Sequence, residues 1–349
     1  MKNLIIITSS VFITITSAFA QREKSANGKP LEGKDEIKAI EKEYGMWTSH
    51  GKFYKNKEWA MCKFSVVYKL TTSMTAKAMA KSKDDAMKVK TSSGAFAILN
   101  GISEADLQKT TDMVAQNFIK RMKDEAGVNV STWNSYKSSK NTDDLREEQE
   151  DKEIYSKSQG LAYAMTYDST PHYNRVIVFI PGGKKLSKEL NKNVMEMCLY
   201  IDFADVVATA AANISSVEGI STITYTLSKE TDQKMYPGIR LVPNLGSESP
   251  GEIGKNLSTT NIKGHDHYGY MFSIGLLNEL VSPLEFVDKI EPSDGKLPAV
   301  LSNRRNNKLK DVTTFNVFVN PEKFTAAVMD VANQYFDKLI KVYKFRASE

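Results

Sequence analysis

Two of the four histidines in this chain lie together in the triplet His265-Asp266-His267. On a strand, residues two apart point to the same side, which would place both imidazoles to share a metal ion. A zinc site needs a third ligand, and the nearest candidate, Asp266, would point to the opposite side. Gly264 and Gly269 flank the triplet, so we expect a polar surface loop. The alternative is metal-assisted hydrolysis that uses His265 and His267.

Other patterns with catalytic potential are less specific. Asp202 and Asp205 follow an apolar stretch, where catalytic carboxylates occur, but hydrogen bonding to neighbouring turns is the more frequent role. Ser49-His50-Gly51-Lys52 fits the S-x-x-K pattern of serine acyl-enzymes without the accompanying S-D-N and K-T-G elements. The chain has no G-x-S-x-G elbow, and neither cysteine has a histidine near it. We therefore predict no catalytic constellation and no cofactor.

Tyrosines provide a third kind of candidate site. Exposed together, such rings would line a groove for sugars or apolar ligands. That ligand site would be formed by Tyr236, Tyr268, Tyr270 and Asp202. Places in the apolar core are the more frequent alternative for the aromatic residues.

The two cysteines, Cys62 and Cys198, allow two interpretations. In an oxidising compartment they can form one disulfide. As small apolar residues they would instead be buried as free thiols. Their separation of 136 positions says nothing about geometry, so both interpretations stay open.

The first twenty residues predict export. Lys2 precedes a short apolar run, and Ala18-Phe19-Ala20 supplies the small-x-small site that a signal peptidase reads. Cleavage there makes Gln21 the first mature residue, with no cysteine to carry a lipid anchor. We expect a periplasmic or secreted protein.

The amino-acid composition of the chain limits the classes of partner that we expect. The formal charge is +5, with 41% hydrophobic and 26% charged residues, as in a globular chain with a substantial core. The lysines are scattered among acidic residues, which argues against nucleic acid as a partner. No later stretch reaches the ~18 apolar residues of a membrane-spanning helix, so we predict no transmembrane span after signal removal.

The clearest structural unit lies between residues 94 and 136. Ser103 and Asp106 predict a capping box at the start of a helix, and Gly127 predicts its end. Strands are predicted before and after the helix, at 95–99 and 128–132. One helix face carries the apolar set Leu107, Thr111, Val114, Phe118, Met122 and Ala126.

Alternating patterns elsewhere predict the organisation of the chain. Further strands are predicted at 64–70, 161–166, 176–180, 197–203, 223–227 and 314–319, and Asn320-Pro321 predicts the start of a final amphipathic helix. We predict a signal peptide at 1–20, a flexible leader at 21–43 and a single extended domain at 44–349, with a charged linker at 141–157 and long loops at 228–255 and 291–310. The expected fold class is α/β (α+β), a mixed, mostly antiparallel sheet with amphipathic helices packed on one face.

Residues 95–133 resemble a known unit. The strand AFAIL, the turn NGIS, the helix ADLQKTTDMVAQNFIKRMKDEAG and the strand VNVSTW are similar to the strand-helix-strand of the curli-assembly lipoprotein family and of the related N-terminal domain of the Tol-system β-propeller protein. The resemblance covers about 40 of 349 residues and implies an α/β envelope-protein fold. That lipoprotein family is lipid-anchored and builds membrane hairpins, whereas the mature N-terminus here lacks the cysteine, so pore formation is not carried over.

These observations predict an exported envelope protein with a non-enzymatic role. We expect it to bind an unknown envelope protein or to assemble with itself. The alternatives are the metal-assisted hydrolase described above and a module that binds carbohydrate or lipid through its aromatic residues.

Overall fold

A computed structural model describes residues 32–43, 47–48, 51–82, 87–145, 153–156, 160–167, 181–218, 223–243, 260–295, 297, 299–302 and 306–349. Within these ranges the chain has the predicted α/β fold, built on two mixed sheets. The predicted signal peptide, the strand predicted at 176–180, and Ser49 and His50 lie outside the described residues. Among the described helices, none is long and apolar enough to cross a membrane.

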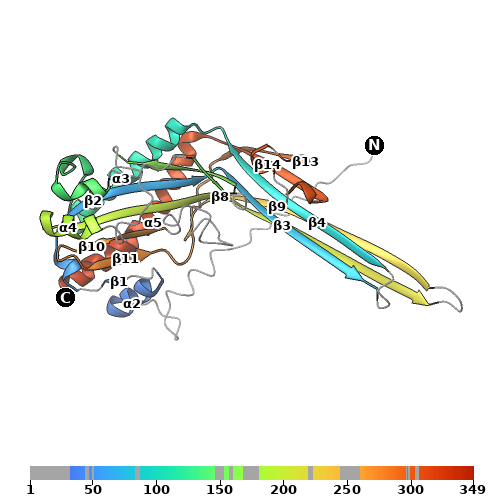
Figure 1. The fold of residues 1–349 in the computed structure, drawn as a ribbon, viewed down its shortest axis with the longest axis horizontal. Coiled ribbons are helices and arrows are strands. Elements are labelled where there is room, and N and C mark those ends of the chain that lie inside the picture. Colours follow the sequence, from blue (N-terminus) through green and yellow to red (C-terminus); the bar gives the residue numbers. More distant parts are fainter. Residues whose placement is uncertain are drawn as a thin grey trace, which may run out of the picture.

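The larger sheet forms the body of the molecule (Figure 1). At its centre β2 and β8 run parallel, and β5 is also parallel to β2, whereas the other described pairs in this sheet are antiparallel. The main order is β1 (Trp47–Thr48), β11 (Met271–Gly275), β10 (Asn261–His265), β8 (Asn193–Glu218), β2 (Glu58–Lys69), β7 (Gly160–Thr166) and β6 (Glu153–Ser156). Three more strands join it: β5 (Asn129–Ser131) on β2, β9 (Ile223–Leu241) on β8, and β12 (Leu280–Val281) on β9.

The smaller sheet begins where β2 ends. β3 follows β2 after one residue, Leu70, so the chain turns directly from one sheet into the other. The strand order is β13 (Val287–Asp294), β14 (Asp311–Val319), β4 (Lys88–Asn100) and β3 (Thr71–Lys81). β14 and β4 are parallel neighbours, and the other two pairs are antiparallel.

Two long hairpins project from the body as an arm (Figure 1). We define the arm as residues 71–82, 87–100, 203–218 and 223–239. β8 has 26 residues and β9 has 19, and their pairing runs out to Glu218 opposite Ile223. At ~3.3 Å per residue, this ladder is roughly 55 Å long. The β3–β4 hairpin packs against it as a second layer.

Small side chains fill the space between the two layers of the arm. Alternation places Ala76, Ala78 and Ala80 on one side of β3, and alanines 208, 210 and 212 on one side of β8. Gln233 on β9 donates a hydrogen bond to Ser93 on β4, which fixes the inner side of each hairpin. Val89 and Val206 are buried on the same inner sides, next to the alanines.

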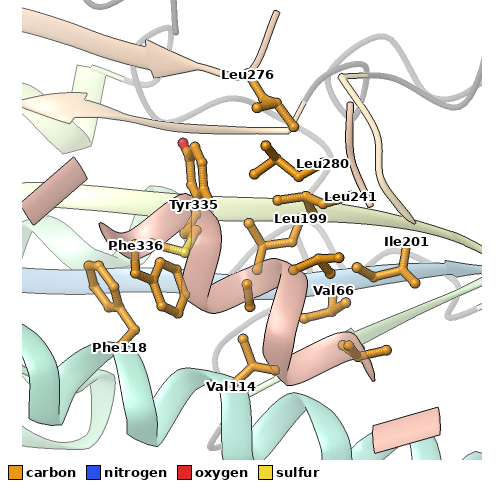
Figure 2. Close-up of a cluster of buried hydrophobic side chains, with 14 of the residues drawn as sticks. Val66, Val114, Phe118, Leu199, Ile201, Leu241, Leu276, Leu280, Tyr335 and Phe336 are labelled. Atoms are coloured by element: carbon orange, nitrogen blue, oxygen red, sulfur yellow. The ribbon is translucent and has the colours of Figure 1, made fainter. Parts of the chain in front are cut away.

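The main core lies between the body sheet and two helices, α3 (Glu104–Ala126) and α5 (Pro321–Ser348). Figure 2 shows Val66, Leu199 and Ile201 of the sheet facing these helices. The rings of Phe118 on α3 and Phe336 on α5 have centroids 5.1 Å apart and join the two helices. The predicted arrangement of amphipathic helices on one face therefore holds for α3 and α5.

Local sequence signals define the ends of both long helices. Ser103 and Asp106 form the predicted capping box, and Gly127 ends α3 in the left-handed conformation at φ +66°. Asn320 caps α5 by accepting hydrogen bonds from the next backbone N–H groups, with Pro321 in the first turn. These predictions are confirmed.

The opposite face of the body sheet carries a smaller cluster. Leu186 of α4 (Pro181–Leu190) packs there with Trp133 and Tyr136, against Ala60 and Val194 of the sheet. Trp133 belongs to the short 3₁₀ turn η2 (Trp133–Ser135). Thus α4 lies on the other side of the sheet from α3 and α5.

The prediction of a loop at 228–255 is wrong for residues 228–241. Ser228–Leu241 belongs to β9, in spite of the Pro237-Gly238 pair. Pro237 lies opposite Ala204, next to a break in the β8–β9 register, where a missing backbone N–H does little harm to the ladder.

Three other predicted irregular segments contain regular structure. Residues of the predicted leader form α2 (Gly33–Glu43), which packs on α5 through Ile37 and Ile40. The charged linker includes a 3₁₀ segment, η3 (Lys140–Leu145), and the edge strand β6. In the loop predicted at 291–310, residues 291–294 belong to β13. It also contains the turns η5 (Ala299–Leu301) and η6 (Asn306–Lys308); a further turn, η1 (Gly51–Lys55), precedes β2.

We expect Phe118→Ala to lower the free energy of unfolding by about 3–4 kcal/mol, because it leaves a cavity between α3, α5 and the sheet. The matched control is Met113→Ala on the same helix, where the side chain is 40% exposed and the expected change is within about 0.5 kcal/mol. Equilibrium urea unfolding measures both, and equal effects would contradict this packing.

Candidate functional site

The predicted site residues lie in three separate places. His265, His267, Tyr268 and Tyr270 lie at the β10–β11 turn, Asp202 and Tyr236 at or near the base of the arm, and Cys62 and Cys198 inside the body sheet. His265 pairs with Val194 of β8, whereas Tyr236 pairs with Asp205. This offset along β8 amounts to roughly 35 Å at ~3.3 Å per residue. The structure therefore does not bring Tyr236 or Asp202 to the aromatic residues of the turn.

The side chain of Asp266 stabilises the turn between β10 and β11. Its carboxylate Oδ1 accepts hydrogen bonds from the backbone N–H groups of Tyr268 and Tyr270, each at 2.9 Å. Gly269 adopts φ +86° and donates its N–H to the carbonyl of Asp266 at 2.7 Å. This is an Asx-type turn. Tyr268 and Tyr270 are half exposed on it. The prediction of a polar surface loop is wrong for His265 and Asp266, because His265 is the last residue of β10 and both side chains are buried.

The two histidines of the turn have different surroundings. His265 is buried, and its Nδ1 has no hydrogen-bond partner in the described structure. Burial lowers the pKa of His265 to about 4, and the nearby ammonium of Lys184 adds to this effect. His267 lies with its ring Nδ1 3.4 Å from Asn193 Oδ1 and its ring against Tyr268. Among the described residues, no group of three or more His, Cys, Asp or Glu side chains is placed to hold a metal ion.

The structure contains both cysteines as free, buried thiols. Cys198 pairs across the sheet with Ser65, three positions beyond Cys62, so the Cα atoms are roughly 10 Å apart at ~3.3 Å per residue. A disulfide requires less than about 7 Å. Burial raises the pKa of Cys62 to about 12, against the opposing hydrogen bond with Tyr136. The geometry favours the second interpretation, two unreactive core thiols.

Asp202 is the centre of a buried ion cluster at the base of the arm. Its Oδ2 lies 3.0 Å from Lys69 Nζ and 3.3 Å from Arg240 Nη2. Its Oδ1 accepts a hydrogen bond from the backbone N–H of Phe203 at 2.8 Å. Asp202 is only 6% exposed, so it has the structural role that we considered more frequent for such a residue.

Each partner of Asp202 comes from a segment that passes from body to arm. Lys69 is the last residue of β2, and its Nζ also donates to Thr72 Oγ1 of β3 at 2.9 Å. Arg240 lies near the end of β9, and its Nη2 donates to the carbonyl of Ala204 at 2.6 Å. Asp202 itself lies at the register break of β8. One carboxylate therefore fixes all three strands where they enter the arm.

Beyond this cluster, the arm exposes long strand edges. β3 is the last strand of the smaller sheet, and residues 204–218 of β8 and 223–238 of β9 pair only with each other among the described strands. Natural proteins usually shorten, cover or interrupt such edges, because unpaired N–H and C=O groups can pair with another chain. The arm is thus the most unusual surface of the described structure.

The β3 side of this surface has a signal in the sequence that was not recognised as a strand. Residues 74–81 alternate with period two, with Ala76, Ala78 and Ala80 on one side and Thr75, Lys77 and Lys81 on the other. Their small and basic types concealed a strand, since β propensity favours branched and aromatic residues.

Comparison of the chain with models of known protein families, with curated proteins and with solved structures finds no match in any of the three. A functional assignment therefore rests on the residues and the geometry. The feature with the clearest functional potential is the arm and its anchor at Asp202.

We expect Asp202→Asn to lower the free energy of unfolding by about 3 kcal/mol, because Lys69 and Arg240 lose their buried counter-ion. Asp205→Asn is the matched control, since this side chain is 57% exposed and its Oδ1 lies 3.9 Å from Arg240 Nη1. Its expected effect is below about 0.5 kcal/mol. Urea unfolding measures the difference, and a similar loss in both variants would rule out the anchoring role.

We expect His265 to make the protein less stable as the pH falls. In the unfolded chain the imidazole binds a proton near its ordinary pKa of 6.5, whereas in the folded protein the pKa is about 4. Between these values the unfolded state binds more protons, so stability is lost as pH decreases through this window. His265→Leu should reduce the loss between pH about 7 and about 4.5 in urea unfolding. The control His267→Leu should keep it, and an unchanged slope in His265→Leu would contradict the assignment.

Proposed function

We propose that this chain is an exported envelope protein with a non-enzymatic binding or assembly role, and that the arm makes the contact. The observation that carries the proposal is the length of unpaired strand edge that projects from the body (Figure 1). The predicted signal peptide at residues 1–20 supports the location.

Strand edges are a common means of recognition. An extended segment adds to an exposed edge through backbone hydrogen bonds, and the side chains on either side give specificity. In this arm, β3 has 11 residues, and residues 223–238 of β9 pair only with β8, so both edges are longer than the ~5–6 residues of an ordinary strand. Unpaired edges of this length make an isolated protein prone to aggregation. A protein that pairs with a partner uses the same edges for backbone hydrogen bonds.

The attachment of the arm also supports a contact role. β8 is a single strand that starts in the body core and ends at the tip of the arm. Lys69 and Arg240 hold its middle through Asp202. A contact at the tip is therefore made by an element that is anchored in the core, which limits the entropy lost on binding.

We expect shortening of the arm to abolish complex formation and to leave the body folded. Two Asn-Gly turns would replace residues 77–92 and 209–232, closing the ladders at the paired residues Ala76 and Ser93, and Ala208 and Gln233. Cross-linking in intact cells, followed by fractionation, should trap the full-length protein in a larger species in the periplasm or medium. The shortened variant should be trapped only as a monomer.

Near-UV circular dichroism and urea unfolding of the shortened variant serve as the control for the body. The proposal fails if the shortened protein, with its body folded, is cross-linked as efficiently as the full-length chain. It also fails if the full-length chain is never trapped in a larger species.

A further inference from the structure

One broad side of the arm is basic. Lys77, Lys81, Lys88 and Lys90 are exposed on the β3–β4 hairpin, and we call this side the basic face. Neither strand contains an acidic residue. The connecting residues 83–86, outside the described structure, add one lysine and two aspartates to the sequence.

Three of the four lysines of the basic face have no counter-ion among the described residues. Lys81 and Lys88 are direct cross-strand partners, and like charges so placed repel one another. Lys77, Lys88 and Lys90 form no ion pair with any described residue. Lys310 brings a further cation to this side, because its backbone N–H donates to Ser92 and its Nζ donates to the carbonyl of Lys90.

The opposite side of the arm is acidic. Gln233 and Thr231 of β9 point inward, since they donate hydrogen bonds to Ser93 and Asp311 of the smaller sheet. The alternate residues Glu230 and Asp232 therefore point outward.

Asp205 of β8 completes this acidic face. Asp205 and Asp232 are 57% and 53% exposed. Lys234 pairs with Asp232 at 2.7 Å, and Arg240 Nη1 lies 3.9 Å from Asp205 Oδ1, whereas Glu230 forms no ion pair with any described residue.

We propose that a second copy of this chain docks on the basic face with its acidic face, so that arms stack between copies. The inference rests on the proposed function and names its partner. Lys88 and Lys90 are two residues apart on one strand, as are Glu230 and Asp232, so both pairs repeat at ~6.8 Å and can meet in register.

The two faces lie on opposite sides of the same two-layer arm, so each copy carries one of each. The contact is heterologous, and it builds a ring or an open chain of copies rather than a closed pair. Exposed ion pairs are individually weak and are screened by salt, so the stacking depends on ionic strength.

The experiment is sedimentation velocity of the mature full-length protein at about 0.1 M and about 1 M salt, where the Debye length falls from ~10 Å to ~3 Å. The wild type should form species heavier than a dimer at low salt and dissociate at high salt. The basic-face variant is Lys77→Glu/Lys88→Glu/Lys90→Glu, and the acidic-face variant is Glu230→Lys/Asp232→Lys. Each alone should associate at least about tenfold more weakly.

Mixing the two reversed variants is the decisive step. Each then offers a face that is complementary to the other, so equal amounts should associate again at low salt. The matched control is Lys229→Glu, which changes the charge of an exposed residue of β9 that points to the inner side with Ala212. It should associate like the wild type.

Several outcomes would overturn the inference: a wild type that stays monomeric, reversed variants that associate normally, or a mixture that does not associate. Stronger association after replacing the three lysines with alanine would show that they only prevent edge pairing, and it too would overturn the inference. If arm shortening abolishes cross-linked complexes while the reversed variants keep them, the contact role of the arm stands and the stacking of charged faces fails.

Discussion

The architecture depends on one buried carboxylate at the junction of body and arm. Asp202 binds Lys69 from the end of β2 and Arg240 from the end of β9, at the point where β8 breaks register. Removing three charged groups from water costs nearly as much as their attraction returns, so the cluster adds little net stability. Its effect is geometric, because Lys69 and Arg240 reach the same carboxylate only when all three strands meet at one angle. That angle directs two long hairpins away from the core.

The arm itself has little to stabilise it apart from backbone pairing. The body core is rich in Phe, Tyr and Leu side chains between the sheet, α3 and α5 (Figure 2). Between the layers of the arm, alanines and Ser93 bury much less apolar area, and hydrophobic stabilisation scales with that area. The close layers and the polar contacts of Gln233 and Asp311 maintain the shape. A surface with so small a core and such long edges gains more from a partner than a well-packed surface would.

The elements that could be predicted from the sequence are those whose determining interactions are local. The ends of α3 follow from Ser103, Asp106 and Gly127, each within a few residues of the backbone groups that it satisfies. A strand was predicted at 223–227, but the rest of β9 could not be found this way, because Pro237-Gly238 has the composition of a loop and forms a strand only through pairing with β8. The same distinction between local and topological determinants applies to the candidate site residues. Tyr268 and Tyr270 were expected together and are close in sequence, whereas the distance of Tyr236 and the partners of Asp202 depend on topology.

The chain passes between body and arm in four segments, and the crossings at β8 and between β2 and β3 lie next to the Asp202 cluster. β8 passes through the junction as a continuous strand, but its ladder is interrupted between Asp202 and Ala204. β2 and β3 are separated by Leu70 alone. Any rotation of the arm relative to the body must therefore change backbone angles at these two positions, and both lie next to the Asp202 cluster. Since Lys69 contacts Asp202 and Thr72 together, such a rotation would separate buried charges. The same interaction that directs the arm thus also resists its movement, and a partner bound to the arm would be held at a fixed angle to the body.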